Sequence, residues 1–352
     1  MADQTLTLNE EAYRIIKIKQ SLFTSNGTTL PPVFSIVFLG DTHTGMKACD
    51  NPPFVKPLIK YEQLLKKIIL ENKGHTLAII HGGDATDYGK ANLQAFIDKT
   101  IEILYKPYSD DSKKIPLFAN IGNHEYELHK NTKGVVTNGT LDAYNELVKS
   151  ITMTKSDPPN QHPDVQVIAL NQLFLRVILL NTGYGNKGTF GTVSPDLFEK
   201  QIEELDKWIG QLEGPKKNSK IRFIVDMHIP PNIGRLGTQQ YNPYDPTTIY
   251  KVPHVLNDKY NKLFKNNLLD KHRDSILTVV AHHRHCKPFV YDKRHNTEFY
   301  LTPAGGNCDI VCKGACDQKC DNNYQYPYHA VKINFKYNNG ILYRDSYEIL
   351  VP

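Results

Sequence analysis

The sequence lacks any hydrophobic run long enough to cross a bilayer. Its longest apolar stretches, 33–39 and 174–180, fall far short of the roughly 20 residues that a membrane-spanning helix needs. The first residues also lack a basic segment followed by an apolar core, so no signal peptide is visible. These absences predict a soluble protein without a membrane span, cytoplasmic by default, while export by another route stays open.

The sequence also lacks a dense stripe of Lys and Arg. The formal net charge of the 352 residues is only +5, and the basic residues are spread along the chain. This balance suits an anionic substrate but gives no clear nucleic-acid patch. There is no internal repeat, low-complexity linker or clear domain boundary. We therefore expect a single domain over 33–352 and leave its oligomeric state open. A strand or hairpin is expected over 1–32, because apolar and polar residues alternate at 14–19.

The cysteines lack the Cys-x-x-Cys spacing that is typical of zinc sites. Four of the six lie one every fourth residue in a loop insertion at about 303–328: Cys308, Cys312, Cys316 and Cys320. This loop has three possible states: its cysteines bind zinc, form two local disulfides or remain reduced thiols. Disulfides would need an oxidising compartment. We interpret Cys49 and Cys286 as bystanders near the predicted site.

Short apolar runs instead alternate with helical patterns. Continuous apolar runs predict strands buried on both faces at 33–39, 77–80, 117–121, 221–225 and 276–281. Apolar residues at helical spacing predict helices at 56–73, 92–105, 195–209 and 256–271. Paired strands are expected at 165–170 and 173–180, and antiparallel strands after residue 289.

All five buried strands end in polar side chains that can bind metal or carry protons. In α/β proteins such strand ends face an open crevice. The residues are Asp41, His43, Asp84, Asp87, Asn123, His124, His228, His283 and His285. Carboxylate, imidazole and amide groups without thiolate suit Mn, Fe or Zn better than a structural zinc site. So many ligands suit two adjacent ions that share a carboxylate, as in phosphoryl displacement.

Each motif alone is frequent by chance, but their order resembles that of the calcineurin-like metallophosphoesterase superfamily. The motifs are Gly-Asp-x-His at 40–43, Gly-Asp-x-x-Asp at 83–87, Gly-Asn-His-Glu at 122–125, His-x-Pro at 228–230 and His-x-His at 283–285. The resemblance covers most of the chain. It implies an α/β fold, a four-layer α/β/β/α sandwich of two mixed sheets flanked by helices, with a dinuclear metal site at the sheet edge.

The resemblance also implies a role for each residue. One metal would be held by Asp41, His43, Asp84 and His285, and the other by Asp84, Asn123, His228 and His283. A metal-bridging hydroxide would attack phosphorus while the metals and Asn123 neutralise the developing charge. His124 would act as general acid beside the leaving oxygen, and Asp87 would orient it.

At three positions the sequence departs from the family pattern, and these departures limit which subfamilies it can resemble. Tyr88 stands where Ser/Thr phosphatases carry a phosphate-binding Arg, and Asp87 stands where purple acid phosphatases carry a Tyr ligand. An iron(III)–tyrosinate centre is therefore not expected. His282 replaces the Gly that usually precedes His-x-His.

We therefore predict a metal-dependent phosphoric ester hydrolase with two Mn, Fe or Zn ions and a phosphorylated substrate. We favour a phosphomonoesterase; the alternatives are a phosphodiesterase acting on nucleotides or other diesters, and a catalytically silent protein-binding scaffold. A silent member would be expected to have lost ligands, which are all present here. Substrate-binding candidates are Asn123, His124, Arg284 and Arg235, the two Arg being weaker because an outward, solvated side chain is the favoured interpretation of each.

Overall fold

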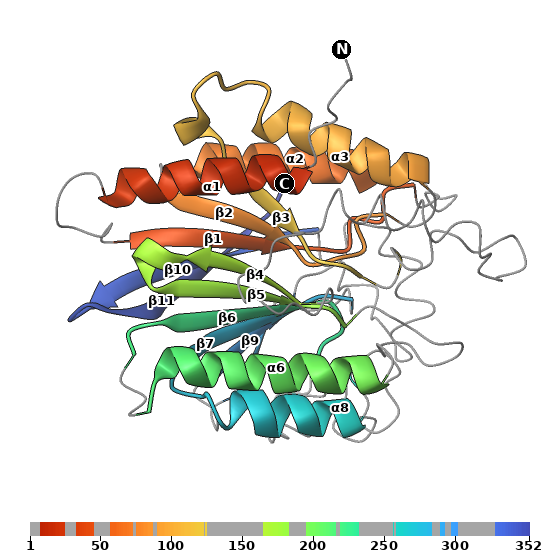
Figure 1. The fold of residues 1–352 in the computed structure, drawn as a ribbon. Helices are drawn as coiled ribbons and strands as arrows, with labels where there is room; N and C mark the ends of the chain where they lie inside the picture. The colour runs from red at the N-terminus through yellow and green to blue at the C-terminus, as the bar shows by residue number, and fades with distance from the viewer. Residues whose placement is uncertain are drawn as a thin grey trace, which may run out of the picture.

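The computed structural model describes residues 8–24, 33–45, 57–72, 75–86, 90–122, 124, 165–182, 195–215, 219–231, 256, 258–283, 289–292, 297–301 and 328–352. These residues form two stacked sheets with helices on both outer faces (Figure 1). The expected four-layer α/β/β/α sandwich is therefore confirmed. Single-domain organisation over 33–352 stays a prediction, and the loop at 303–327 lies outside the described residues.

The first sheet has five strands in the order β11-β10-β1-β2-β3. Their bounds are β1 Val33–Leu39, β2 Thr76–His81, β3 Leu117–Ala119, β10 Ala330–Asn338 and β11 Ile341–Leu350. Strands β1, β2 and β3 are parallel, whereas β10 is antiparallel to both of its neighbours. Helices α2 (Pro57–Glu71) and α3 (Lys90–Leu104) connect the parallel strands and cover the outer face (Figure 1).

The second sheet has six strands in the order β4-β5-β6-β7-β9-β8. Their bounds are β4 Val165–Leu170, β5 Leu175–Leu180, β6 Arg222–Met227, β7 Ile276–Ala281, β8 Phe289–Asp292 and β9 Thr297–Leu301. The expected antiparallel pairs β8/β9 and β10/β11 are present, but β9 also lies parallel to β7. Helices α6 (Pro195–Glu213) and α8 (Asp258–Leu263), with a π-helical continuation at Phe264–Leu269, cover the outer face (Figure 1).

Strand β1 is apolar except for Ser35, because both of its faces are covered. Phe34, Ile36 and Phe38 belong to the core between the two sheets. Val37 and Leu39 point the other way and belong to the core under α2 and α3. Because successive side chains in a strand point to opposite faces, a strand covered on both faces admits a polar residue only where a buried partner satisfies it, as Thr76 does for Ser35 at 3.0 Å.

The N-terminal segment corrects one prediction. Residues expected to form a strand or hairpin include helix α1, Leu8–Thr24. The short alternation at 14–19 fits the two-residue period of a strand and also the 3.6-residue period of a helix. Ala12, Ile15 and Ile16, however, recur at helical spacing and are all buried. This single buried face selects the helix.

Helix α1 covers the edge that the two sheets share. Tyr13 packs its ring edge-on against Phe118 of β3, and its hydroxyl donates to the Val167 carbonyl of β4 at 3.3 Å. The Gln20 amide donates to the Ala169 carbonyl of the same strand at 3.2 Å. Because β3 and β4 are edge strands, α1 protects both from pairing with another chain.

Replacing Ile16 with Ala should lower the free energy of unfolding by about 2–5 kcal/mol, because it removes buried methylene groups and leaves a cavity between α1 and the sheets. Urea unfolding of the purified variant measures this loss. Lys17→Ala, at an exposed position of the same helix, is the control and should stay within about 0.5 kcal/mol of the original. Equal losses in the two variants would contradict the placement of α1.

Candidate metal centre

Six residues of the predicted site are described, and all lie just after the carboxyl ends of β1, β2, β3, β6 and β7. They are Asp41, His43, Asp84, His124, His228 and His283. Backbone hydrogen bonds join the neighbouring strand ends, from the Asp41 N–H to the Gly83 carbonyl at 2.9 Å and from the His282 N–H to the His228 carbonyl at 3.0 Å. The two sheets therefore present these side chains at one common edge.

The backbone at this edge is strained. Four residues here adopt positive φ: Asp41 at 51°, His43 at 49°, Asp84 at 52° and His283 at 66°. Non-glycine residues avoid this region, at a cost of about 1–3 kcal/mol each, and such strain concentrates at functional sites. Side-chain hydrogen bonds stabilise this strained backbone conformation. The Asp41 carboxylate accepts from the His283 N–H at 2.9 and 3.1 Å, and Asp84 Oδ1 accepts from the His124 N–H at 2.8 Å.

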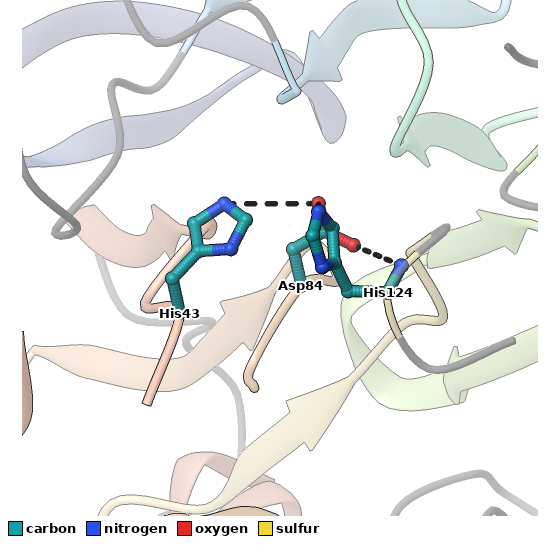
Figure 2. Close-up of side chains that lie close together, drawn as sticks. All are labelled: His43, Asp84 and His124. Atoms are coloured by element: carbon teal, nitrogen blue, oxygen red, sulfur yellow. Dashed lines mark hydrogen bonds and ion pairs between the residues drawn. The ribbon is translucent and has the colours of Figure 1, made fainter. Parts of the chain in front are cut away.

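The first cluster of possible ligands consists of His43, Asp84 and His124. Figure 2 shows these three side chains, which come from three neighbouring strand ends. His43 Nε2 lies 3.8 Å and His124 Nε2 lies 4.0 Å from the same oxygen, Asp84 Oδ2. Asp41 Oδ1 is 3.9 Å from His43 Nε2. One nitrogen or oxygen from each member of the cluster lies within 4.8 Å of the others, a spacing that one metal ion can span.

The second cluster consists of Asp84, His228 and His283. His228 Nδ1 lies 2.9 Å from the Gly82 carbonyl, and because a carbonyl only accepts, this nitrogen carries the hydrogen. His228 Nε2 then faces Asp84 Oδ2 at 3.1 Å and His283 Nδ1 at 3.2 Å. While His228 is neutral its Nε2 has no hydrogen, so its approach to the Asp84 carboxylate is favourable only with a proton on Nε2 or a metal ion in its place.

Asp84 belongs to both clusters and is ionised. Burial alone would raise the pKa of its carboxyl, but the facing His228, His124 and His43 hold that pKa well below its ordinary value. Asp41, His43, His228 and Asp84 are almost completely buried. Buried carboxylate and imidazole groups that converge on one carboxylate are chemically suited to hold a metal ion.

The other predicted site residues lie outside the described residues. These are Asn123, His285, Asp87, Arg284 and Arg235, together with Tyr88 and all six cysteines. Their assignments stay predictions.

A buried hydrogen-bond chain beside the site was not predicted. Thr42 Oγ1, between Asp41 and His43, lies 2.9 Å from both His81 Nε2 and the Tyr328 hydroxyl. Burial raises the pKa of Tyr328 and lowers the pKa of His81 to about 3, so both groups are neutral. The hydrogen bonds to Thr42 fix the Asp41–His43 segment. The one sequence signal for them was a histidine, His81, at the end of an apolar strand just before Gly82.

The neutral state of His81 predicts acid sensitivity of the metal-free protein. With a folded pKa of about 3 against about 6.5 when unfolded, only the unfolded state takes up a proton between these values. Stability from this group is therefore lost as pH falls below about 6.5, by about 2 kcal/mol at pH 5. Urea unfolding with chelator at pH 7 and pH 5 should show this loss, and His81→Gln should reduce it. An unchanged pH dependence in the variant would contradict the assignment.

In the part of the chain that the structure describes, every helix is too short or too polar to cross a membrane.

Comparison with known proteins gives one family. A family model for calcineurin-like phosphoesterases matches residues 34–270, which include Asp41, Asp84 and His228; His283 lies beyond the match. A search of curated proteins finds no significant match.

Among solved structures, a provisionally assigned 5′-nucleotidase from Staphylococcus aureus shares 12% identity over 91% of this chain and 54% of its own, with a TM-score of 0.47. Purple acid phosphatase PPD1 from yellow lupin shares 15% identity over 86% and 49%, with a TM-score of 0.47. The calcineurin-like phosphoesterase YfkN from Bacillus subtilis shares 11% identity over 91% of each chain, with a TM-score of 0.41. The chain thus spans about half the length of the first two structures.

Proposed function

Because the chain belongs to the calcineurin-like phosphoesterase family, we propose that it hydrolyses phosphate esters at a dinuclear metal centre shared by Asp84. One observation carries the proposal: the ionised Asp84 carboxylate is common to both clusters that could hold an ion. Bound ions, which we propose to be Mn, Fe or Zn, would activate water and neutralise charge on the phosphoryl oxygens.

The described residues divide into two sides around Asp84. On one side lies His43 with Asp41 close to it, and we propose that His285 completes this ligand set. On the other side lie His228 and His283, and we propose that Asn123 completes that set.

His124 has a different position from the other histidines. Its side chain is 17% exposed, whereas those of His43 and His228 are 2% and 0% exposed. Its backbone N–H is anchored on Asp84 Oδ1, so the ring lies at the rim of the centre on a fixed main chain. We propose that it donates a proton to the leaving oxygen, with Asp87 as its orienting partner.

We propose a phosphomonoester as the substrate, and hydrolysis of an aryl phosphomonoester and an aryl phosphodiester side by side tests this. With Mn²⁺ added, the monoester should turn over faster than the diester, and chelator should stop both reactions. Protein carrying Asp84→Asn, purified identically, controls for contaminating phosphatases. Faster diester hydrolysis would assign a phosphodiesterase, whereas no turnover by protein with two bound ions would favour the scaffold alternative.

A further inference from the structure

A second polar network lies directly under the metal-binding side chains. Asp226 Oδ2 lies 2.8 Å from His282 Nε2, and Asp226 Oδ1 accepts a hydrogen bond from the Asn120 amide at 2.9 Å. Asp226 and His282 are fully buried, and Asn120 is almost so. The metal centre proposed above uses none of these three residues as a ligand.

The network joins the two sheets at the ligand-bearing edge. Asn120 follows β3 of the first sheet, whereas Asp226 lies in β6 and His282 follows β7 of the second. The connected strand ends lead directly to possible ligands, since His228 lies two residues after Asp226 and His283 is next to His282.

The His282 ring fills a space that two glycines leave open. A Cβ atom on Gly40 would lie 2.5 Å from His282 Nδ1, and a Cβ atom on Gly82 would lie 1.7 Å from His282 Nε2. Gly40 directly precedes Asp41, and the Gly82 carbonyl orients the His228 ring. The imidazole therefore lies against the backbone that follows β1 and β2, two of the ligand-bearing strand ends of the first sheet.

A buried histidine in this position needs a polar partner, because an unpaired buried polar group is costly. Asp226 supplies that partner, and Asn120 in turn supplies a donor for the second oxygen of Asp226. His282 stands where the family pattern usually has Gly, and in this chain its ring is paired with the Asp226 carboxylate.

We propose that Asp226 and His282 are positioning residues that set the spacing between the metal ligands of the two sheets. This inference rests on the metal centre proposed above. The contact between Asp84 Oδ2 and His228 Nε2, 3.1 Å long, crosses from the first sheet to the second. A metal ion that binds ligands from both sheets is held tightly only when the strand ends of the two sheets stay at a fixed distance from each other.

Asp226→Asn tests the proposal with little change of shape. The new amide cannot accept from both His282 and Asn120, so one of the two hydrogen bonds is either lost or reversed, and reversal forces the His282 ring into its other tautomer. We expect Mn²⁺ affinity, measured by titration of the metal-free protein, to fall about 10–100-fold. The melting temperature of the metal-free protein is measured in parallel.

A matched control exists at the other end of β7. His272 is buried between Glu213 Oε2 at 2.9 Å and Asp206 Oδ1 at 3.0 Å, before β7 begins. Glu213→Gln perturbs a buried histidine–carboxylate pair of the same kind, so it should lower the melting temperature and leave Mn²⁺ affinity unchanged.

Unchanged Mn²⁺ affinity in Asp226→Asn, with normal binding by the original protein, would overturn the positioning role alone. An equal loss of affinity in Glu213→Gln would overturn it too, by showing a general effect of destabilisation. An original protein that binds no Mn²⁺ would instead contradict the metal centre itself.

A double-mutant cycle tests the ring contact without metal. Gly82→Ala should lower the melting temperature strongly, because the nearest atoms to the added Cβ all belong to His282. In the His282→Gly background most of this loss should disappear. Equal losses in both backgrounds would contradict the proposed contact.

Discussion

Asp84→Asn is expected to remove both metal ions and to reduce kcat/KM at least about 1,000-fold, equal to about 4 kcal/mol of transition-state stabilisation. The substitution keeps the shape of the side chain and an oxygen for the His124 N–H. It removes the charge that both clusters share, and a neutral amide is a poor bridge between two cations. Elemental analysis and hydrolysis of an aryl phosphate measure the two losses.

Asp345→Asn, on the exposed face of β11, is the control and should keep both metal and turnover. Asp84→Asn protein that still holds two ions at the original affinity would contradict the bridging role, whatever its turnover.

His124→Ala is expected to lower kcat about 100- to 10,000-fold while metal content stays at the original level. Ala keeps the backbone N–H that binds Asp84 Oδ1, so the variant removes only the ring. Loss of a proton donor should matter most for a poor leaving group. The reduction in kcat should therefore be larger with phenyl phosphate than with 4-nitrophenyl phosphate.

The geometry makes this a demanding test, because the His124 ring also lies within ligand distance of His43 and Asp84. A variant that loses one ion would identify His124 as a ligand. Equal losses with the two aryl phosphates would argue against proton donation by its ring.

Many of the strands were predictable from the sequence, because a strand buried on both faces has a largely apolar sequence. Strands β1, β2, β6 and β7 are predominantly apolar, and polar residues such as Asp41 and His228 follow soon after their ends. Since parallel strands place their carboxyl ends at one edge, the meeting of these residues follows from topology.

The remainder depends on contacts that local sequence does not encode. Thr42 meets Tyr328 from 286 positions away, and Asp226 meets His282 from 56 positions away, so both pairs require the fold to be known. The positive φ of Asp41 and Asp84 was equally hidden, because neither residue is a glycine. Helix α1 was missed because a six-residue alternation is too short to distinguish the two periods.

The shared role of Asp84 is tested most directly by anomalous scattering from crystals soaked in Mn²⁺. Two peaks about 3.5–4 Å apart should flank Asp84 Oδ2, one beside His43 and the other between His228 and His283. A single peak, or two peaks that do not share Asp84, would contradict the dinuclear centre.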